Sequence, residues 1–230
     1  MRKTLGYTAS CAALILLLSA CGTGGGAAGA AGSSSSMAAS VPQGEHKVLI
    51  AYFSYGENRA ASSGGDIDAN ASASIQPDGG EMTGNTGLIA RDIQNAVGGD
   101  LFSIRTETPY PAGYNDTVSV GREEQLEKAR PALTVSVDNM DGYDVVFLGY
   151  PNWWGDMPMA VYSFLDSYDL SGKTVIPFCT SGGSALSDTV ASIRAAEPGA
   201  SVLDGFHARD RDTDESEDAV RRWLETLSLL

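Results

Sequence analysis

The feature that most constrains the fold is a run of apolar residues in the middle of the chain, residues 145–148, followed at once by a Gly- and Pro-bounded turn, residues 149–155. A strand that is apolar on both faces is typical of a parallel sheet covered by helices on both sides. In open sheets of that kind, ligands bind beyond the carboxyl ends of the strands. The turn after this run therefore marks a candidate binding site.

This turn carries two adjacent tryptophans, Trp153 and Trp154, of the three in the chain. Buried tryptophans are common packing anchors, so both indoles fit a role in the core. Adjacent residues in an extended loop point in different directions, however, so one indole can pack inward while the other faces a ligand. We favour a flat aromatic ligand over two core anchors.

The first residues of the chain, 1–20, predict a secretory signal peptide. Two basic residues precede an apolar stretch, residues 12–18, that is too short to span a membrane as a helix. The ending Leu-Ser-Ala-Cys is similar to the lipobox of bacterial lipoproteins, in which cleavage leaves a lipid-bearing cysteine, here Cys21. The alternative is an ordinary signal peptide with an incidental cysteine. We expect an extracytoplasmic protein held at the cell membrane by its lipid anchor alone.

A low-complexity segment follows the signal. Residues 21–44 contain almost only Gly, Ala and Ser and predict a flexible tether, which leaves residues 45–230 for one globular domain. Loss of Arg2 and Lys3 with the signal takes the formal net charge from −14 to −16, two positive charges fewer. So acidic a domain argues against nucleic acid as a partner and against binding to anionic lipid by charge.

The cysteines and histidines exclude some further kinds of site. With Cys11 in the signal and Cys21 acylated, Cys179 is the one remaining thiol, so no disulfide can form within the domain. The two histidines, His46 and His207, are too few for a Cys-His metal site. We expect Cys179 to be buried and inert.

The domain alternates between strand and helix patterns. Strands are expected at 47–53, 101–105, 145–148, 173–178 and 200–203, and helices at 88–97, 114–130, 157–168, 187–196 and 215–227. This alternation predicts an α/β fold with a doubly wound, five-stranded parallel sheet. Pro177 has no N–H to donate, which suggests that its ladder stops there. The helix at 114–130 is charged on most positions, so we expect a solvated outer face.

A hydroxyl- and glycine-rich turn, Thr83, Gly84, Asn85 and Thr86, stands directly before the helix at 88–97. The free N–H groups and positive dipole end of a helix N-terminus hold a phosphate without a lysine. Hydroxyls add donors, and glycine lets the backbone approach closely. A helix cap and turn explain the same residues. The strand upstream favours the phosphate site.

A long insertion, residues 55–82, separates this turn from Ser54 at the end of the first strand. Its Gly, Ser, Ala, Asn and Asp residues show no sustained period, so we expect an irregular surface loop. A register without an insertion would make residues 54–58 the phosphate loop. We reject it because Glu57 would oppose a phosphate and because no helix pattern follows.

Three strand-end segments together resemble the flavodoxin family, more closely its branch with a Tyr-Phe-Ser strand end, a Thr-Gly-Asn-Thr turn and a Pro-Asn-Trp-Trp loop. The first is Ser54 with the turn at 83–86, the second is the tryptophan loop, and the third is the Cys-Thr-Ser-Gly-Gly-Ser segment at 179–184. The resemblance extends from residue 47 to the C-terminus. Family members usually join the serine directly to the turn, so the insertion is a departure.

The resemblance implies FMN as cofactor and the strand order 2-1-3-4-5. The phosphate is then expected at Ser54, Thr83, Gly84, Asn85 and Thr86. The tryptophan loop would flank the isoalloxazine ring, with an indole or Tyr150 stacked on it, and the third segment would meet the pyrimidine edge through its backbone. The residues of these two segments are Tyr150, Pro151, Asn152, Trp153, Trp154 and Gly155, and Thr180, Ser181, Gly182 and Gly183. Electron-rich rings and an acidic surround predict a flavin of lowered reduction potential.

The function implied is electron transfer at the cell surface, with a redox protein or a small quinone-like acceptor as partner. The first alternative is an FMN oxidoreductase that uses NAD(P)H or a quinone. The three loops offer it no general acid or base, since Asp156 fits a helix cap better. The second alternative is a tethered binding module without flavin, because fold does not dictate function.

Overall fold

The structure is a computed structural model that describes residues 41–42, 44–61, 75–78 and 81–230. The predicted signal peptide, Cys21 and nearly all of the predicted tether lie outside the described residues, as does the middle of the insertion. No helix within the described ranges is long and apolar enough to cross a membrane.

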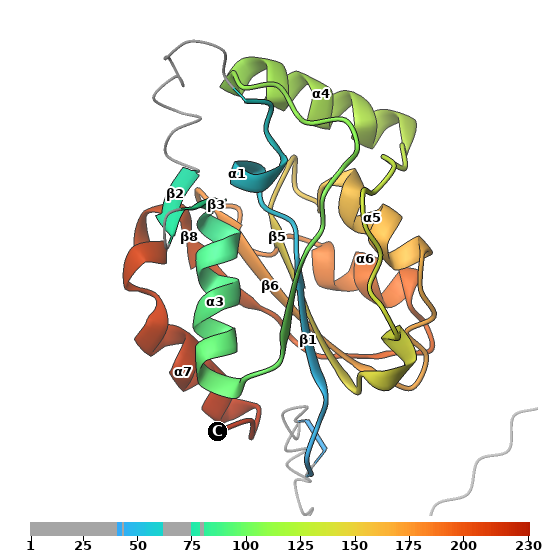
Figure 1. The fold of residues 1–230 in the computed structure, drawn as a ribbon, viewed down its shortest axis with the longest axis vertical. Helices are drawn as coiled ribbons and strands as arrows, with labels where there is room; N and C mark the ends of the chain where they lie inside the picture. The colour runs from blue at the N-terminus through green and yellow to red at the C-terminus, as the bar shows by residue number, and fades with distance from the viewer. Residues whose placement is uncertain (1–40, 43, 62–74, 79–80) are drawn as a thin grey trace, which may run out of the picture. The chain divides into compact units, whose positions relative to one another are not determined.

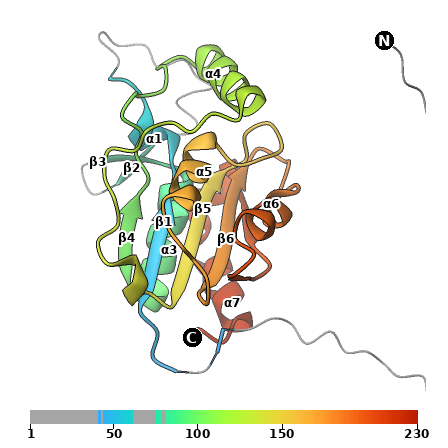
Figure 2. The ribbon, with the colours of Figure 1, turned by 90° about the vertical axis from the view of Figure 1, so that its right-hand side faces the viewer.

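A parallel sheet forms the centre of the domain (Figures 1 and 2). Its strands lie in the order β4-β1-β5-β6-β7, with β8 also paired to β6, and every pairing among them is parallel. The strands are β1 (Val48–Tyr52), β4 (Asp100–Ser103), β5 (Val145–Pro151), β6 (Thr174–Ser181), β7 (Ser201–Val202) and β8 (Phe206–Arg209). The predicted order 2-1-3-4-5 is confirmed, with the fifth strand divided into β7 and β8.

Helices cover both faces of the sheet (Figure 1). Neighbouring residues of β1 belong to different cores: Ile50 packs in the core that contains Ile89 and Ile93, whereas Leu49 packs in the core that contains Phe164. The first core holds α3 (Asn85–Val97) and α7 (Glu217–Thr226), and the second α5 (Met159–Asp166) and α6 (Thr189–Ala196). Strands buried on both faces explain the continuous apolar runs.

The prediction that the hydrogen-bond ladder of this strand stops at Pro177 is wrong, because β6 continues to Ser181. Pro177 is tolerated because the neighbouring edge is interrupted beside it. Val175 pairs with Val202 of β7 and Phe178 with Phe206 of β8, so the outer edge carries one extra residue between the two pairings. This β-bulge removes the need for a donor from the proline.

The described parts of the insertion are ordered, contrary to the expected irregular loop. A short helix, α1 (Tyr55–Asn58), follows β1 directly, and an antiparallel hairpin, β2 (Ile75–Asp78) with β3 (Glu81–Gly84), leads into α3. Gly56 of α1 fits against this hairpin so closely that a Cβ there would lie 2.0 Å from the Thr83 carbonyl oxygen. The insertion therefore returns Thr83 to the end of β1.

Three further elements complete the domain. They are the helix α4 (Tyr114–Glu127) and the 3₁₀ turns η1 (Met140–Gly142) and η2 (Asp210–Glu215). The helix α4 lies beyond the carboxyl ends of the strands (Figures 1 and 2). The chain enters at the other end of the sheet, where the backbone N–H of Val41 donates to the carbonyl oxygen of Leu227 over 3.2 Å.

Candidate ligand-binding site

The three predicted strand-end segments meet at the carboxyl edge of the sheet. The backbone N–H of Asn152 donates to the carbonyl oxygen of Thr180 over 2.8 Å, which joins the tryptophan loop to the third segment. The hydroxyls of Thr86 and Thr180 lie 2.9 Å apart and join the start of α3 to the same strand end. Segments far apart in sequence thus lie together at the edge where ligands bind in sheets of this kind.

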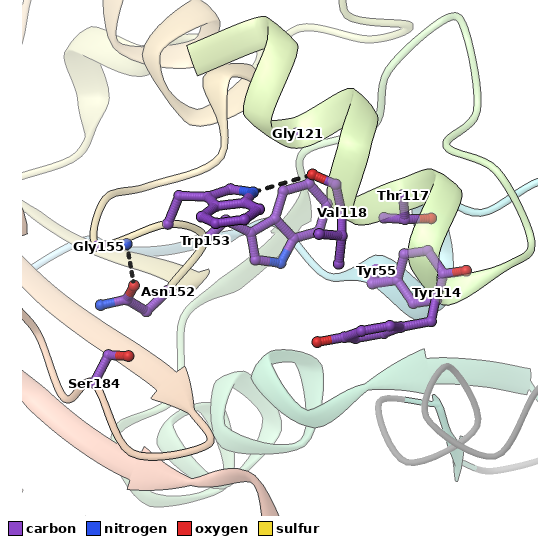
Figure 3. A pocket seen from close by; sticks show the side chains of 10 residues that line it. Tyr55, Tyr114, Thr117, Val118, Gly121, Asn152, Trp153, Gly155 and Ser184 are labelled. Atoms are coloured by element: carbon purple, nitrogen blue, oxygen red, sulfur yellow. Dashed lines mark hydrogen bonds between the residues drawn. The ribbon is translucent and has the colours of Figure 1, made fainter. Parts of the chain in front are cut away.

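A cavity of about 360 Å³ opens beside the tryptophan loop (Figure 3). Its volume lies within the range of about 300–1,000 Å³ that is usual for small-molecule sites. Aromatic side chains make up much of its wall. The lining residues are Tyr55, Tyr114, Thr117, Val118, Gly121, Asn152, Trp153, Trp154, Gly155 and Ser184.

The two indoles have different environments. Trp153 packs inward, with its ring edge-to-face against Phe53 and Tyr110 at centroid distances of 5.4 and 5.2 Å. Trp154 is 51% exposed, and its indole N–H donates to the carbonyl oxygen of Val118 over 3.0 Å. Both rings still line the cavity. Trp153 therefore anchors the loop, and Trp154 offers an accessible aromatic face.

The tryptophan loop has a strained backbone. Trp153 and Asp156 exchange backbone hydrogen bonds, and the two residues between them have positive φ, +58° at Trp154 and +81° at Gly155. Both central residues of a type I′ turn have φ in this range, which suits glycine but not tryptophan. Strain of this kind costs about 1–3 kcal/mol and is typical of binding sites. The turn places the Trp154 ring against α4, where the Arg122 guanidinium lies 5.2 Å from the ring centroid.

Tyr150 does not belong to the cavity. Its side chain is fully buried in the core, and its hydroxyl donates to Thr189 Oγ1 over 2.9 Å. Burial raises the pKa of Tyr150 above its usual value of 10.0. The ring is thus not available to stack on a ligand, because β5 runs one residue past Tyr150 and keeps its side chain between sheet and helices.

The helix α4 forms a wall of the cavity, which the sequence interpretation missed. Its lining residues Tyr114, Thr117, Val118 and Gly121 recur at the spacing of one helical face. Gly121 allows the close approach, since a Cβ there would lie 3.0 Å from Trp153 Cε3. The prediction of a solvated helix is correct only for the opposite face of α4. The small residues at 117 and 121 were the sequence feature that could have indicated a packed face.

The predicted phosphate turn is buried at the start of α3. Thr83, Asn85 and Thr86 are each at most 5% exposed, and Gly84 stands at the N-cap position. Gly84 has no side chain that could cap the start of the helix. The side chain of Asn85 accepts hydrogen bonds from Gln76 and Thr213 over 2.8 and 3.2 Å.

Ser54 lies beside this turn with an unused hydroxyl. It is fully buried, and its Oγ finds no hydrogen-bond partner within the described part of the chain. Gly56, two residues later, packs against the backbone of Thr83 and Gly84. An unsatisfied buried hydroxyl costs about 1–3 kcal/mol, so it indicates a group that the folded chain does not supply itself.

Glu57 also lies at this turn, although the sequence argument excluded it. Its Oε1 accepts hydrogen bonds from Tyr52 and Thr83 over 2.8 and 2.7 Å, and its Oε2 accepts one from Ser103. Burial and the Glu57 carboxylate raise the pKa of Tyr52 above its usual value of 10.0. Contrary to one ground for rejecting residues 54–58 as the phosphate loop, a short helix, α1, does follow Ser54. The other ground, an acid at this position, stays a prediction.

The third segment is shaped by Ser181. Its Oγ accepts from the backbone N–H groups of Gly183 and Ala185 over 3.2 and 3.0 Å and lies 2.9 Å from His207 Nε2. Gly182 and Gly183 are exposed, although the N–H of Gly183 is already held by Ser181. Of this segment, Ser184 reaches the cavity.

Two other residues singled out earlier have structural roles. Cys179 is 1% exposed, and burial raises the pKa of its thiol to about 12, so the reactive thiolate is suppressed, as expected. The Asp156 carboxylate accepts from the N–H of Met157 over 2.8 Å and from the hydroxyl of Tyr162 over 3.0 Å. Asp156 does not cap α5 as predicted, since Pro158 stands at the N-cap position; its bonds instead join the tryptophan loop to that helix.

Comparison with known proteins gives a consistent result. Residues 81–227 match the family described as Flavodoxin. A comparison with curated proteins gave no match.

Among solved structures, the chain is similar to a protein from Bacteroides eggerthii with a provisional flavoprotein assignment, at 29% identity and a TM-score of 0.61, over 80% of this chain and 99% of that chain. A protein from Bacteroides uniformis with the same assignment is 28% identical, with a TM-score of 0.61, over 78% of this chain and 98% of that chain. A Lactobacillus acidophilus flavoprotein in complex with FMN is 20% identical, with a TM-score of 0.53, over 74% of this chain and 98% of that chain. This similarity shows a shared fold.

Proposed function

The chain belongs to the flavodoxin family, and on that premise we propose that it binds FMN at the carboxyl edge of the sheet and transfers electrons between redox partners. The observation that carries the proposal is the buried Ser54 hydroxyl, which has no partner among the described residues, together with an aromatic cavity at the same end of the domain. The Lactobacillus acidophilus flavoprotein of the same fold, solved with FMN, supports the choice of cofactor.

The phosphate end of FMN fits the first segment. The hydroxyl of Ser54 would donate to a phosphate oxygen, and the N–H groups at the start of α3 would do the same. Thr86 stands in the first turn of that helix. Hydrogen bonds to a charged oxygen are stronger than those between neutral groups, so this donor set suits an anion.

The ring end of FMN fits the aromatic cavity. Tyr55, which lines the cavity, follows Ser54 directly in the chain, which supports a ligand that reaches from the first segment to the cavity. When bound, FMN supplies a ring that accepts and releases electrons. Trp153 would exclude water from the inner side, and the backbone of Gly182 and Gly183 would reach the polar edge of the ring.

A half-exposed wall favours electron transfer to a partner at the surface. Trp154 is 51% exposed and Tyr114 43%, so the outer side of the cavity borders solvent. We propose a redox protein or a small quinone-like acceptor as partner. We also propose that the N-terminal region places the protein outside the cytoplasm, anchored to the cell membrane through lipid on Cys21.

Purification of the full chain in detergent tests this function. We expect a yellow protein with flavin absorbance, or a colourless one that becomes yellow and quenches flavin fluorescence on addition of FMN. A protein that ignores added FMN would contradict the proposal. For a holoprotein, no NAD(P)H oxidation in the presence of a quinone is expected of an electron carrier, and rapid oxidation would instead indicate a reductase.

A further inference from the structure

Glu57 draws together hydroxyl groups from three parts of the chain. It accepts from Tyr52 at the end of β1, from Thr83 at the end of the hairpin and from Ser103 at the end of β4. A hydroxyl has one proton to donate, so a group held by Glu57 cannot donate to a second acceptor. Arg105 donates to Ser103 over 3.3 Å.

The carboxylate lies at the start of α3. The Oγ1 of Thr83, 2.7 Å from Glu57, also packs against the first turn of that helix, where a Cβ on Gly87 would lie 1.8 Å from it. Helix N-termini stabilise negative charge. Glu57 is therefore an internal anion placed beside the same helix end that would receive the flavin phosphate.

Two effects then oppose a phosphate at this end of the site. A phosphate that needs the hydroxyl of Thr83 must displace Glu57 from it. The two negative charges also repel each other, and at separations of a few ångströms this repulsion changes affinity by a factor of about ten or more. A flavin without a phosphate meets neither effect.

We infer that Glu57 is a specificity-determining residue that lowers the preference of the site for FMN over riboflavin. The inference rests on the proposed flavin-binding function and deepens it. Glu57 reaches this position because the insertion supplies both α1, which carries it, and the hairpin that brings Thr83 against it. The insertion thus sets the relative affinity of the site for FMN and riboflavin.

Titration of the full-length apoprotein with FMN and with riboflavin, in parallel, tests the inference. The quantity compared is the ratio of the two dissociation constants. Structural damage to the protein weakens the binding of both flavins and so leaves this ratio unchanged. In Glu57→Gln we expect the preference for FMN to rise by about tenfold or more, with riboflavin affinity nearly unchanged. Glu57→Ala serves as a second variant with the same expectation.

Glu225→Gln is the matched control, because it removes one negative charge from an exposed position on α7. We expect its ratio to equal that of the wild type. An unchanged or reduced ratio in both Glu57 variants, with both flavins bound, would overturn the inference alone. Binding of neither flavin by wild type or variants would overturn the proposed function and the inference with it.

Discussion

The hydroxyl of Thr86 lies 2.9 Å from that of Thr180, and this contact ties the first turn of α3 to the end of β6. Both side chains are buried, at 2% and 1% exposure, so the bond is protected from water. It holds two of the three segments of the site in a fixed relation before any ligand arrives. Preformed sites of this kind lose less entropy on binding.

The Thr86–Thr180 bond should be measurable as a coupling energy. We expect Thr86→Val and Thr180→Val each to destabilise the fold, and the double variant to lose about 1 kcal/mol less than the sum of the two. Urea unfolding of the four proteins in the absence of flavin measures this. Strict additivity would mean that the two hydroxyls do not interact.

Ser54→Ala separates ligand binding from folding. The Ser54 hydroxyl is buried without a partner among the described residues, so its removal should leave the stability of the apoprotein within about 1 kcal/mol of wild type, or raise it. FMN affinity should fall about tenfold, because a hydrogen bond to phosphate is lost. Thermal unfolding and flavin titration check the two outcomes.

Ser119→Ala is the control for that variant, since Ser119 is an exposed serine on α4. It should change neither quantity. Equal FMN affinity in Ser54→Ala and Ser119→Ala would show that the phosphate does not use the Ser54 hydroxyl.

Substitution of the two tryptophans should likewise distinguish a residue that stabilises the fold from one that binds the ligand. Trp153→Ala removes a ring packed on Phe53 and Tyr110 and should cost about 3 kcal/mol of stability. Trp154→Ala removes the hydrogen bond to Val118 at a half-exposed position and should cost about 1 kcal/mol but weaken FMN binding about fivefold. Denaturant unfolding and flavin fluorescence test the pair. A large stability loss in Trp154→Ala would argue against its role as a ligand-facing ring.

Acid should loosen the third segment through His207. Burial, and then the neighbouring Arg209, lower the pKa of His207 below its usual value of 6.5, with Asp210 acting in the opposite sense. The fold thus favours the neutral ring, which can accept the proton of the Ser181 hydroxyl, while Ser181 Oγ accepts two backbone N–H bonds. Protonation removes that acceptor.

The sign follows from the lowered pKa. The unfolded chain binds a proton more readily, so stability is full above about pH 6.5 and falls as the pH drops toward the folded-state pKa. We expect the loss of stability and of FMN affinity between about pH 7 and pH 5 to be smaller in His207→Gln. Thermal unfolding and flavin titration across this range measure both. Parallel pH profiles for variant and wild type would exclude His207 as the cause.

The bound flavin should have a lower reduction potential than free FMN. Reduction adds negative charge, and the chain carries a formal net charge of −14, with electron-rich tyrosine and tryptophan rings lining the cavity. Reductive titration of the holoprotein measures the potential. A value above that of free FMN would mean that local donors outweigh the surrounding charge.

The sequence predicted the parts of the fold that depend on local pattern. The apolar run at 145–148 predicted a buried strand, and the alternation of strand and helix patterns predicted a parallel sheet. The strand order came from the resemblance to the flavodoxin family and not from periodicity. The meeting of Thr86, Asn152 and Thr180 at one edge follows from the same topology.

The parts that it did not predict depend on contacts between distant residues. Glu57 meets Thr83 and Ser103, 26 and 46 residues away in the chain, and no local pattern reports such pairs. The charged residues of α4 suggested a solvated helix, but one face of it lines the cavity. That role depends on the position of Trp153, which the sequence of α4 alone does not reveal. Tyr150 followed the binding motif in sequence, but the alternation of β5 turned its ring into the core.

The extra residue between β7 and β8 fixes which side chains of the outer strand belong to which layer. It places Phe206 beside Phe178 in the layer of Trp223 and sets His207 beside Cys179, on the side from which it reaches Ser181. Deletion of Gly205 would exchange these parities, since a shift of one residue inverts a strand's facing. The methyl group of Ala208 would then stand where the imidazole meets Ser181, so the deletion would abolish the pH dependence expected through His207.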